Sequence, residues 1–257
     1  MGFLGDLVGR VRSDLARTPL DETALMTRAI ASPPPRDLPA ALRSAGPGAV
    51  IAEVKRSSPS AGRIADVDAS EQARRYAEAG AAAISVLTEP RHFDGALADL
   101  RAVRTATSVP VLRKDFVVHP AQVIEARAAG ADAVLLIAAA VTDAELKALV
   151  TAAFDLGMAP LVETHSETDL GRALATEAEM IGVNARDLET LEVDVERALG
   201  SLAGVPRDRL AVMESGIASR ADVERAVEAG AAAVLVGEAL MRAGDPVAAL
   251  RELRGAT

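Results

Sequence analysis

Short runs of apolar residues recur along the chain, and each is separated from the next by a stretch with a helical pattern. Three of the runs begin just after an Ala-Gly pair that closes such a stretch, at Gly80, Gly130 and Gly230. A glycine just past the end of a helix typically adopts the left-handed conformation that stops the helix. A short, continuous apolar run is typical of a strand buried on both faces of a parallel sheet. The repeated order of helix, glycine and strand therefore predicts βαβ units.

The whole sequence contains eight such strand-like runs. Their predicted bounds are Val50–Val54, Ala83–Leu87, Pro110–Arg113, Ala133–Ile137, Ala159–Glu163, Met180–Val183, Leu210–Met213 and Ala233–Val236. Each interval has room for one crossover helix, and such connections are almost always right-handed. Eight units of this kind predict an α/β fold, the (β/α)8 or TIM barrel. A doubly wound open sheet is the alternative; the even spacing of the strands and the lack of a dinucleotide fingerprint after the first strand disfavour it.

The first 48 residues precede this barrel and predict an N-terminal helical extension. Phe3–Ala16 and Glu22–Ala31 have helical patterns, Ser32–Asp37 (SPPPRD) is a stiff linker, and Leu38–Ser44 is a further short helix. No Gly/Ser tract or charge block marks a second domain, so residues 1–257 are expected to form one barrel domain. The extension can close the bottom of the barrel or contribute to its mouth, and the sequence leaves both open.

Composition narrows the possible classes of function. The chain holds 28 Lys and Arg against 37 Asp and Glu, 2% aromatic residues and no Cys. Without Cys, the chain lacks disulfides, zinc–thiolate sites and thiol catalysis. An acidic chain with few aromatic residues is not expected to bind nucleic acid. No apolar run reaches the roughly 18 residues of a membrane span, and the N-terminus has no signal-peptide pattern, so we expect a cytoplasmic protein without a membrane partner.

Six of the predicted strands have residues suited to chemistry at their carboxyl ends or directly after them. In a parallel barrel the carboxyl ends of the strands meet at one face, where active sites of this fold lie. The residues are Glu53, Lys55, Lys114, Asp115, Glu163, Asn184, Arg186, Glu214, Ser215, Gly237 and Glu238. Any one of them is expected in a solvated loop, but together they predict one catalytic rim. Asn184 can bind a substrate hydroxyl or form a turn, and Arg186 can bind an anion or pair with an acidic residue.

Lysine is rare in this chain, which contains only Lys55, Lys114 and Lys147. Lys147 falls in the middle of a predicted helix and is expected to be a surface charge. Arg stays protonated, whereas a buried Lys can exchange a proton, so Lys55 and Lys114 are candidate acid–base or substrate-binding groups. Glu163 and Glu214 are their candidate acid–base partners. A structural ion pair and a Schiff-base nucleophile are the open alternatives for the two lysines.

Two loops predict a phosphate site. Ser215 and Gly216 follow the seventh strand, and Gly237 and Glu238 follow the eighth. These are the loops that bind phosphate in many barrels. Ser58 can add a hydroxyl from the loop after the first strand. Glu238 is expected to offer its backbone amide while its carboxylate turns away from the anion.

Two further expectations concern a metal and a mobile loop. The three histidines, His92, His119 and His165, have no ligand spacing, so no metal site is expected. The loop from Lys55 to Arg63 contains Ser, Pro and Gly, and we expect it to move over the site.

Taken together, these segments resemble the indole-3-glycerol phosphate synthase family over nearly the full chain. The matching motifs, in family order, are IAEVKRSSPSAG, ISVLTEPRHFDG, PVLRKDF, GADAVLLI, LVETH, GVNARDLETLEVD, ESGI and LVGEALM. The resemblance implies a barrel enzyme of tryptophan biosynthesis with an N-terminal helical extension. It also implies ring closure of 1-(2-carboxyphenylamino)-1-deoxyribulose 5-phosphate, a phosphosugar bearing an anthranilate ring, to indole-3-glycerol phosphate with loss of CO₂ and water. We expect no cofactor, and a monomer or weak homodimer.

The resemblance also implies roles for individual residues. Lys114 resembles the general acid of the family, Glu163 its acid–base partner in the dehydration, and Lys55 the lysine that contacts the substrate carboxylate. Residues at positions that contact the substrate or orient the lysines are Glu53, Asn184 and Glu214. Residues on the phosphate loops are Ser58, Ser215, Gly216, Gly237 and Glu238. Residues around the aromatic ring are Phe93, Phe116, Leu135, Arg186, Leu188 and Leu235.

Three other functions remain open from the sequence. A phosphoribosylanthranilate isomerase shares the fold but usually relies on a Cys–Asp pair, and this chain has no Cys. A Schiff-base aldolase acting through Lys55 or Lys114 is expected to leave a covalent adduct after borohydride reduction. A non-catalytic phosphosugar-binding protein is expected to show no turnover.

Overall fold

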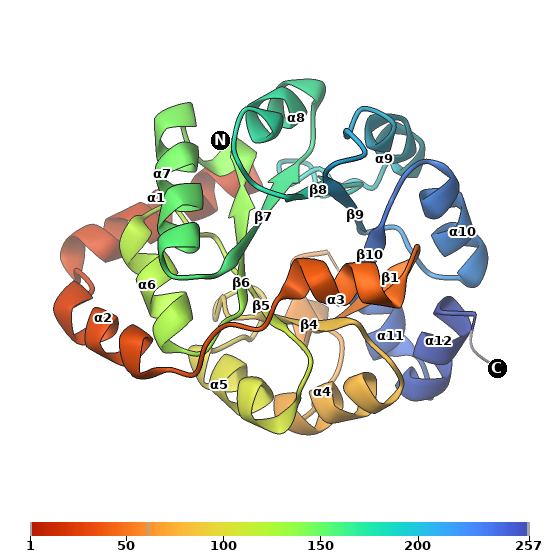
Figure 1. Cartoon of the computed structure of the whole chain (residues 1–257), viewed down its shortest axis with the longest axis horizontal. Coiled ribbons are helices and arrows are strands. Elements are labelled where there is room, and N and C mark those ends of the chain that lie inside the picture. Colours follow the sequence, from red (N-terminus) through yellow and green to blue (C-terminus); the bar gives the residue numbers. More distant parts are fainter. Residues whose placement is uncertain (1, 61, 256–257) are drawn as a thin grey trace.

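The apolar runs form the strands of a closed parallel barrel (Figure 1). The structure, a computed structural model, describes residues 2–60 and 62–255. The barrel strands are β1 (Ala49–Val54), β4 (Ala83–Leu87), β5 (Val111–Lys114), β6 (Ala133–Ile137), β7 (Ala159–Thr164), β8 (Met180–Asn184), β9 (Leu210–Glu214) and β10 (Ala233–Val236). Each strand pairs in parallel with the next, and β10 pairs with β1 to close the sheet. The predicted (β/α)8 barrel is confirmed.

Four of the strands extend one residue past the predicted carboxyl end, to Lys114, Thr164, Asn184 and Glu214. A polar side chain does not end a strand, because the ladder of backbone hydrogen bonds continues while both backbones stay extended. β5 begins at Val111, one residue later than predicted, and the preceding proline has no N–H to donate to a ladder. Three candidate site residues are therefore the last residues of strands, where neighbouring strands hold them.

Helices alternate with the strands and cover the outside of the barrel (Figure 1). They are α4 (Ala69–Glu78), α5 (Leu97–Ala106), α6 (Pro120–Ala128), the single-turn η1 (Ala138–Ala140), α7 (Asp143–Asp155), α8 (Glu167–Leu174), α9 (Val195–Leu202), α10 (Arg220–Glu228), α11 (Glu238–Arg242) and α12 (Pro246–Leu253). Gly80, Gly130 and Gly230 follow α4, α6 and α10 with φ of +93°, +92° and +111°, the left-handed conformation predicted for them. Lys147 is exposed on α7, as expected.

The N-terminal extension serves both ends of the barrel. Its helices are α1 (Phe3–Arg17), α2 (Glu22–Ala31) and α3 (Leu38–Ala45). α3 lies across the end of the barrel that faces the viewer in Figure 1, where Arg43 pairs with Glu179, the residue before β8 begins. α1 reaches the opposite end, and the Leu4 N–H donates to the Leu188 carbonyl at 3.2 Å. The two arrangements left open by the sequence therefore both occur.

The loop between β1 and α4 folds into a small hairpin instead of an irregular loop. Its strands, β2 (Ser57–Ser58) and β3 (Gly62–Arg63), pair antiparallel, and Ser58 is buried. Ala61, between them, lies outside the described residues. The expected mobility of this segment stays a prediction.

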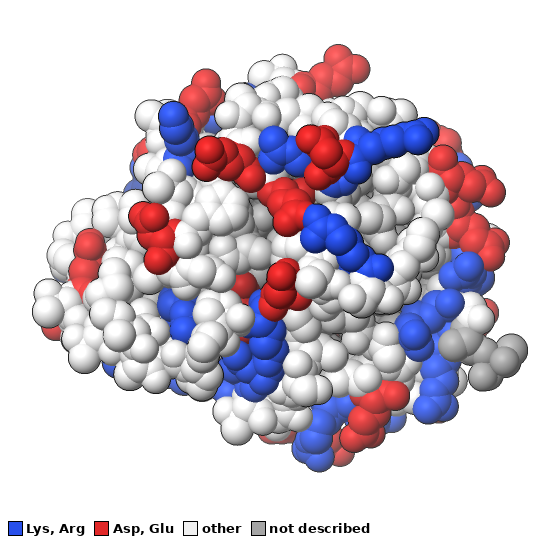
Figure 2. All heavy atoms as spheres, in the orientation of Figure 1, with Lys and Arg blue, Asp and Glu red and all other residues white. Residues whose placement is uncertain are grey.

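The surface carries charges of both signs. Figure 2 shows acidic and basic side chains interspersed over the face seen in Figure 1, and no broad basic area lies there among the described residues. In the part of the chain that the structure describes, no helix has the length and apolar content required to span a membrane.

Candidate active site

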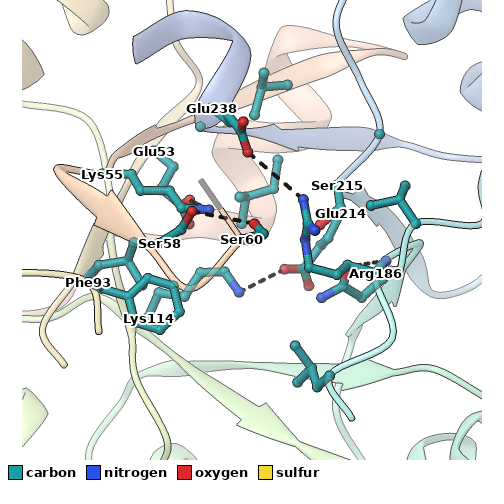
Figure 3. A pocket seen from close by; sticks show the side chains of 18 of the residues that line it. Glu53, Lys55, Ser58, Ser60, Phe93, Lys114, Arg186, Glu214, Ser215 and Glu238 are labelled. Carbon is teal, nitrogen blue, oxygen red and sulfur yellow. Dashed lines mark hydrogen bonds and ion pairs between the residues drawn. The ribbon is translucent and has the colours of Figure 1, made fainter. Parts of the chain in front are cut away.

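A cavity of about 430 Å³ opens at the carboxyl ends of the strands. Residues from all eight strands or the loops that follow them line it, and so does Phe3 from α1. Every residue that the sequence analysis placed in a catalytic or substrate-binding role lies in its wall. Figure 3 shows the polar side chains of this wall converging on one space. Closure of the barrel therefore brings together the groups that the sequence predicted at one rim.

Lys114 lies at the centre of the buried charges. Its Nζ is 3.1 Å from Glu163 Oε2 and 3.2 Å from Glu214 Oε2, and both carboxyl side chains are 1% exposed. Burial acts to lower the pKa of Lys114, but the neighbouring acidic groups, Glu163 first among them, outweigh burial and raise it. Lys114 is thus a charged ammonium that points into the cavity, which is the form required of a proton donor.

The two carboxyl groups beside Lys114 have opposite pKa shifts. Burial acts to raise the pKa of Glu163, but the charge of Lys114, the nearby His165 ring and a hydrogen bond from Asn184 Nδ2 to Oε1 (3.1 Å) outweigh burial and lower it. Burial raises the pKa of Glu214 to about 8; Lys114 opposes this effect and Glu163 reinforces it. Near neutral pH, Glu163 is therefore ionised while Glu214 keeps its proton. Two carboxyl groups held in different states can act as base and acid at one site.

Two glycines leave space for buried carboxyl groups. A Cβ at Gly182 on β8 would overlap the Glu214 carboxyl, and a Cβ at Gly237 after β10 would lie 2.5 Å from Glu53 Oε1. Neither position accepts a side chain without displacing a site residue. Gly237, predicted as part of a phosphate loop, therefore also makes room for Glu53.

Lys55, which follows β1, lies next to aromatic rings. Its Nζ is 3.8 Å from Glu53 Oε1 and 5.8 Å from the centre of the Phe93 ring. Burial lowers the pKa of Lys55, although the Glu53 carboxylate acts to raise it. The rings of Phe93 and Phe116 lie 6.2 Å apart, centre to centre. The apolar part of the wall continues through Leu135, Leu188 and Leu235. A cation beside an apolar, aromatic wall suits an aromatic ring that carries a carboxylate.

The loops after β9 and β10 bring backbone close to the cavity. Ser215 and Gly216 both have positive φ, +65° and +75°. A Cβ on Gly216 would come within 2.7 Å of the Val195 side chain, so this turn requires glycine. Ser58 faces these loops from the β2–β3 hairpin, with its Oγ 3.5 Å from Ser60 Oγ.

The carboxylate of Glu238 differs from the sequence expectation. Instead of turning away, its Oε2 lies 3.9 Å from Arg186 Nη2 at the cavity mouth (Figure 3), and its Oε1 accepts a hydrogen bond from Arg242 Nε at 3.0 Å. Two arginines attract the carboxylate, which is the physical reason for the difference. Of the partners left open for Arg186, the structure places an acidic residue distant in the sequence next to it.

The cavity wall includes residues that the sequence analysis did not single out, among them Phe3, Leu191 and Arg242. Phe3 belongs to the extension, Leu191 to the loop after β8, and Arg242 to α11. The left-handed backbone of Leu191 (φ +64°) has no signal in its residue type, and nothing in the sequence distinguishes Arg242 from other arginines. Of these three residues, Phe3 had the clearest signal in the sequence, because it is one of only four phenylalanines. Among the residues that the structure describes, no cluster of three or more His, Cys, Asp or Glu is arranged to hold a metal ion.

The fold and the site together define a class: a (β/α)8-barrel enzyme with buried lysine and glutamate groups for acid–base chemistry on a small molecule. The family model of indole-3-glycerol phosphate synthase matches residues 6–253. Indole-3-glycerol phosphate synthase of Nocardioides sp. (strain ATCC BAA-499 / JS614) is 54% identical over 259 aligned residues, covering 99% of both chains. The same-named protein of Rhodococcus jostii (strain RHA1) is 50% identical, covering 98% of this chain and 95% of its own.

The chain belongs to the indole-3-glycerol phosphate synthase family, and it is a carboxy-lyase of tryptophan biosynthesis. Among solved structures, a crystal structure of 3-hexulose-6-phosphate synthase matches with a TM-score of 0.66 at 20% identity. This match covers 80% of this chain and 98% of the other, and it supports the fold alone.

Proposed function

We propose that Lys114, Glu163 and Lys55 carry out the ring closure at the mouth of the barrel. The observation that supports this proposal is the position of the Lys114 ammonium between an ionised and a protonated carboxyl group, on the floor of a partly aromatic cavity. The substrate carries a carboxylate, a ketone, hydroxyls and a phosphate, and the wall offers a matching group for each.

In the first step, Lys114 is the general acid. The ring carbon that bears the carboxylate attacks the ketone carbon, and a C–C bond forms. The proton of Lys114 passes to the former carbonyl oxygen, which becomes a hydroxyl. Carbon dioxide then leaves, and the electron pair of the broken C–C bond restores the aromatic ring. General acid catalysis of this kind accelerates a reaction by roughly 10² to 10⁴-fold.

In the second step, Glu163 is the base. It removes a proton from the carbon next to the ring nitrogen, and the new C=C bond forms as the C–O bond breaks. The hydroxyl takes up the proton of Glu214, directly or through Lys114, and leaves as water. Glu163 is suited to accept a proton because its pKa is lowered, whereas Glu214 is held protonated beside it.

Other groups of the cavity wall bind and orient the substrate. Lys55 pairs with the substrate carboxylate, and this negative charge favours the protonated form of the buried amine. The anthranilate ring packs on Phe93 and Phe116. The phosphate accepts backbone N–H groups of the loops after β9 and β10, a position typical of barrels. Asn184 holds the carboxylate of Glu163 through a hydrogen bond, and Glu53 holds the ammonium of Lys55.

A fluorescence assay for the indole product tests these roles. In Lys114→Ala and Glu163→Gln the indole signal is expected to fall by at least about 10²-fold while inorganic phosphate still binds. Lys147→Ala is the matched control, because this lysine is exposed on α7 and is expected to leave turnover unchanged. Normal turnover in Lys114→Ala overturns the assignment of the acid.

We also propose that the chain works in the cytoplasm as a monomer or weak homodimer. Every group that the proposed chemistry uses belongs to one chain, so this chemistry requires no second copy. Sedimentation analysis at micromolar concentration tests the assembly state. A tight dimer whose separation abolishes turnover contradicts the proposal.

A further inference from the structure

The proposed mechanism leaves the side chain of His165 without a role. His165 follows the end of β7, two residues after Glu163, and alternate residues of an extended chain point to the same side. Its Nε2 lies 3.6 Å from Glu163 Oε1, and the side chain is 11% exposed. This nitrogen is buried and makes no hydrogen bond within the described part of the chain. A buried ring nitrogen thus faces a buried carboxylate at slightly more than hydrogen-bond distance.

The backbone around this ring is anchored on both sides. The His165 carbonyl accepts a hydrogen bond from Arg197 on α9, and a second nitrogen of that guanidinium donates to the Asn184 carbonyl at 2.8 Å. The His165 N–H donates to Asp169 Oδ2 on α8 at 3.4 Å. Arg197 therefore joins the ends of β7 and β8, the two strands that carry Glu163 and Asn184. The backbone that carries the ring is thus held at the ends of both strands.

Other charged groups also face His165, and each has partners of its own. Asp187, in the loop after β8, and Asp169, at the start of α8, both accept backbone N–H groups of their own loops. Arg197 binds backbone carbonyls. Glu163 is the carboxylate to which Nε2 points.

We propose that His165 is a positioning residue for Glu163: its Nε2–H donates to Glu163 Oε1 and keeps that carboxylate ionised and aligned while Lys114 transfers its proton to the substrate. This inference rests on the proposed function. Before the transfer, Lys114 donates a hydrogen bond to Glu163 Oε2, and Asn184 donates one to Glu163 Oε1. Once Lys114 is neutral, Glu163 loses its nearest positive charge, and His165 adds a second donor on Oε1 beside Asn184. Hydrogen bonds of active sites are often long without ligand and shorten in the reactive complex.

The test compares variants that lack or keep a donor at position 165. In His165→Leu, kcat is expected to fall roughly 10- to 100-fold, which is the effect of losing a hydrogen bond to a charged group. KM is expected to change little, because Glu163 acts on the reacting atoms. The acid limb of the kcat–pH profile is expected to move to higher pH by roughly one unit, since a carboxylate with fewer donors is protonated more readily. His165→Gln keeps an N–H donor and is expected to recover most of the rate and the position of the limb.

His119→Gln is the control for a merely structural effect. His119 is exposed and caps α6 by accepting the Ala121 N–H, so this change weakens a helix cap outside the cavity wall. It is expected to leave the acid limb in place. The inference is overturned if the acid limb of the kcat–pH profile does not move in His165→Leu. It is also overturned if His165→Gln is as slow as His165→Leu.

Two further measurements separate the outcomes. Lys114→Ala is assayed alongside: normal turnover there refutes the proposed function, whereas an inactive Lys114→Ala with an unmoved limb in His165→Leu refutes only the role of His165. In the unaltered protein, ¹⁵N spectra of the labelled ring report which nitrogen carries the proton of the neutral form. A proton on Nε2 agrees with the inference, and a proton on Nδ1 overturns it even if the Leu variant does not fold.

Discussion

The protonated state of Glu214 leads to a quantitative prediction for Glu214→Gln. Burial raises the pKa of this carboxyl from 4.5 to about 8, so the folded protein keeps a proton that the unfolded chain releases above pH 4.5. Between these two values, stability therefore falls as pH rises, by about 1.4 kcal/mol per pH unit. From pH 4.5 to pH 7 the accumulated cost is about 3 kcal/mol. Glutamine has the shape of the protonated acid and removes this cost, while Lys114 keeps its ion pair with Glu163.

We expect Glu214→Gln to unfold at higher denaturant concentration than the unaltered protein at pH 7, by about 3 kcal/mol in free energy, and to match it near pH 4. Turnover is expected to fall at the same time, because stability and activity often oppose each other at buried charged sites. Circular dichroism is the suitable probe, since the chain has no Trp.

Glu145→Gln is a control that is expected to change stability at pH 7 in the opposite direction. A hydrogen bond from Arg12 lowers the pKa of Glu145 to about 2, so this carboxylate stabilises the fold above pH 4.5, and its contribution is lost as pH falls through about 2. This variant is expected to be slightly less stable at pH 7. The reasoning on Glu214 is refuted if Glu214→Gln is no more stable at pH 7, or if its advantage stays constant between pH 5 and pH 8.

Two other substitutions test the packing and the charges of the cavity. Gly182→Ala places a Cβ where the Glu214 carboxyl lies, so it is expected to cost about 1–3 kcal/mol in stability and to reduce turnover. A variant with unchanged denaturant unfolding and unchanged kcat would contradict the close packing at this position. Glu238→Gln removes a negative charge between Arg186 and Arg242, so it is expected to tighten binding of inorganic phosphate by roughly threefold, measured by calorimetry. Weaker phosphate binding in this variant would count against a phosphate site at these loops.

Most of the fold was predictable because each local pattern had a single structural solution. The apolar runs are too short for helices and too continuous for half-exposed strands, and the glycines after α4, α6 and α10 end their helices as predicted. The strand ends were less predictable. Hydrophobic pattern alone places Lys114, Asn184 and Glu214 in loops, whereas the ladder of the closed sheet includes them.

The sequence predicted which residues belong to the candidate site but not which of them contact one another. Strand-end residues of a barrel meet at one rim whatever their identity, so their common cavity followed from the fold class. Their partners did not follow. Lys114 lies between Glu163 and Glu214, while Lys55 pairs with Glu53, and no spacing along the chain distinguishes these pairs from the reverse.

By itself, the sequence determined the elements, their order and the chemical groups available, because hydrophobic periodicity and glycine conformation act over a few residues. The tertiary structure alone decided which carboxyl group is ionised, where Glu238 points, and that His165 faces Glu163. These properties depend on burial and on distances of a few ångströms between residues far apart in the chain. Electrostatic interactions change strongly over such distances in a buried site, and only closure of the barrel sets them.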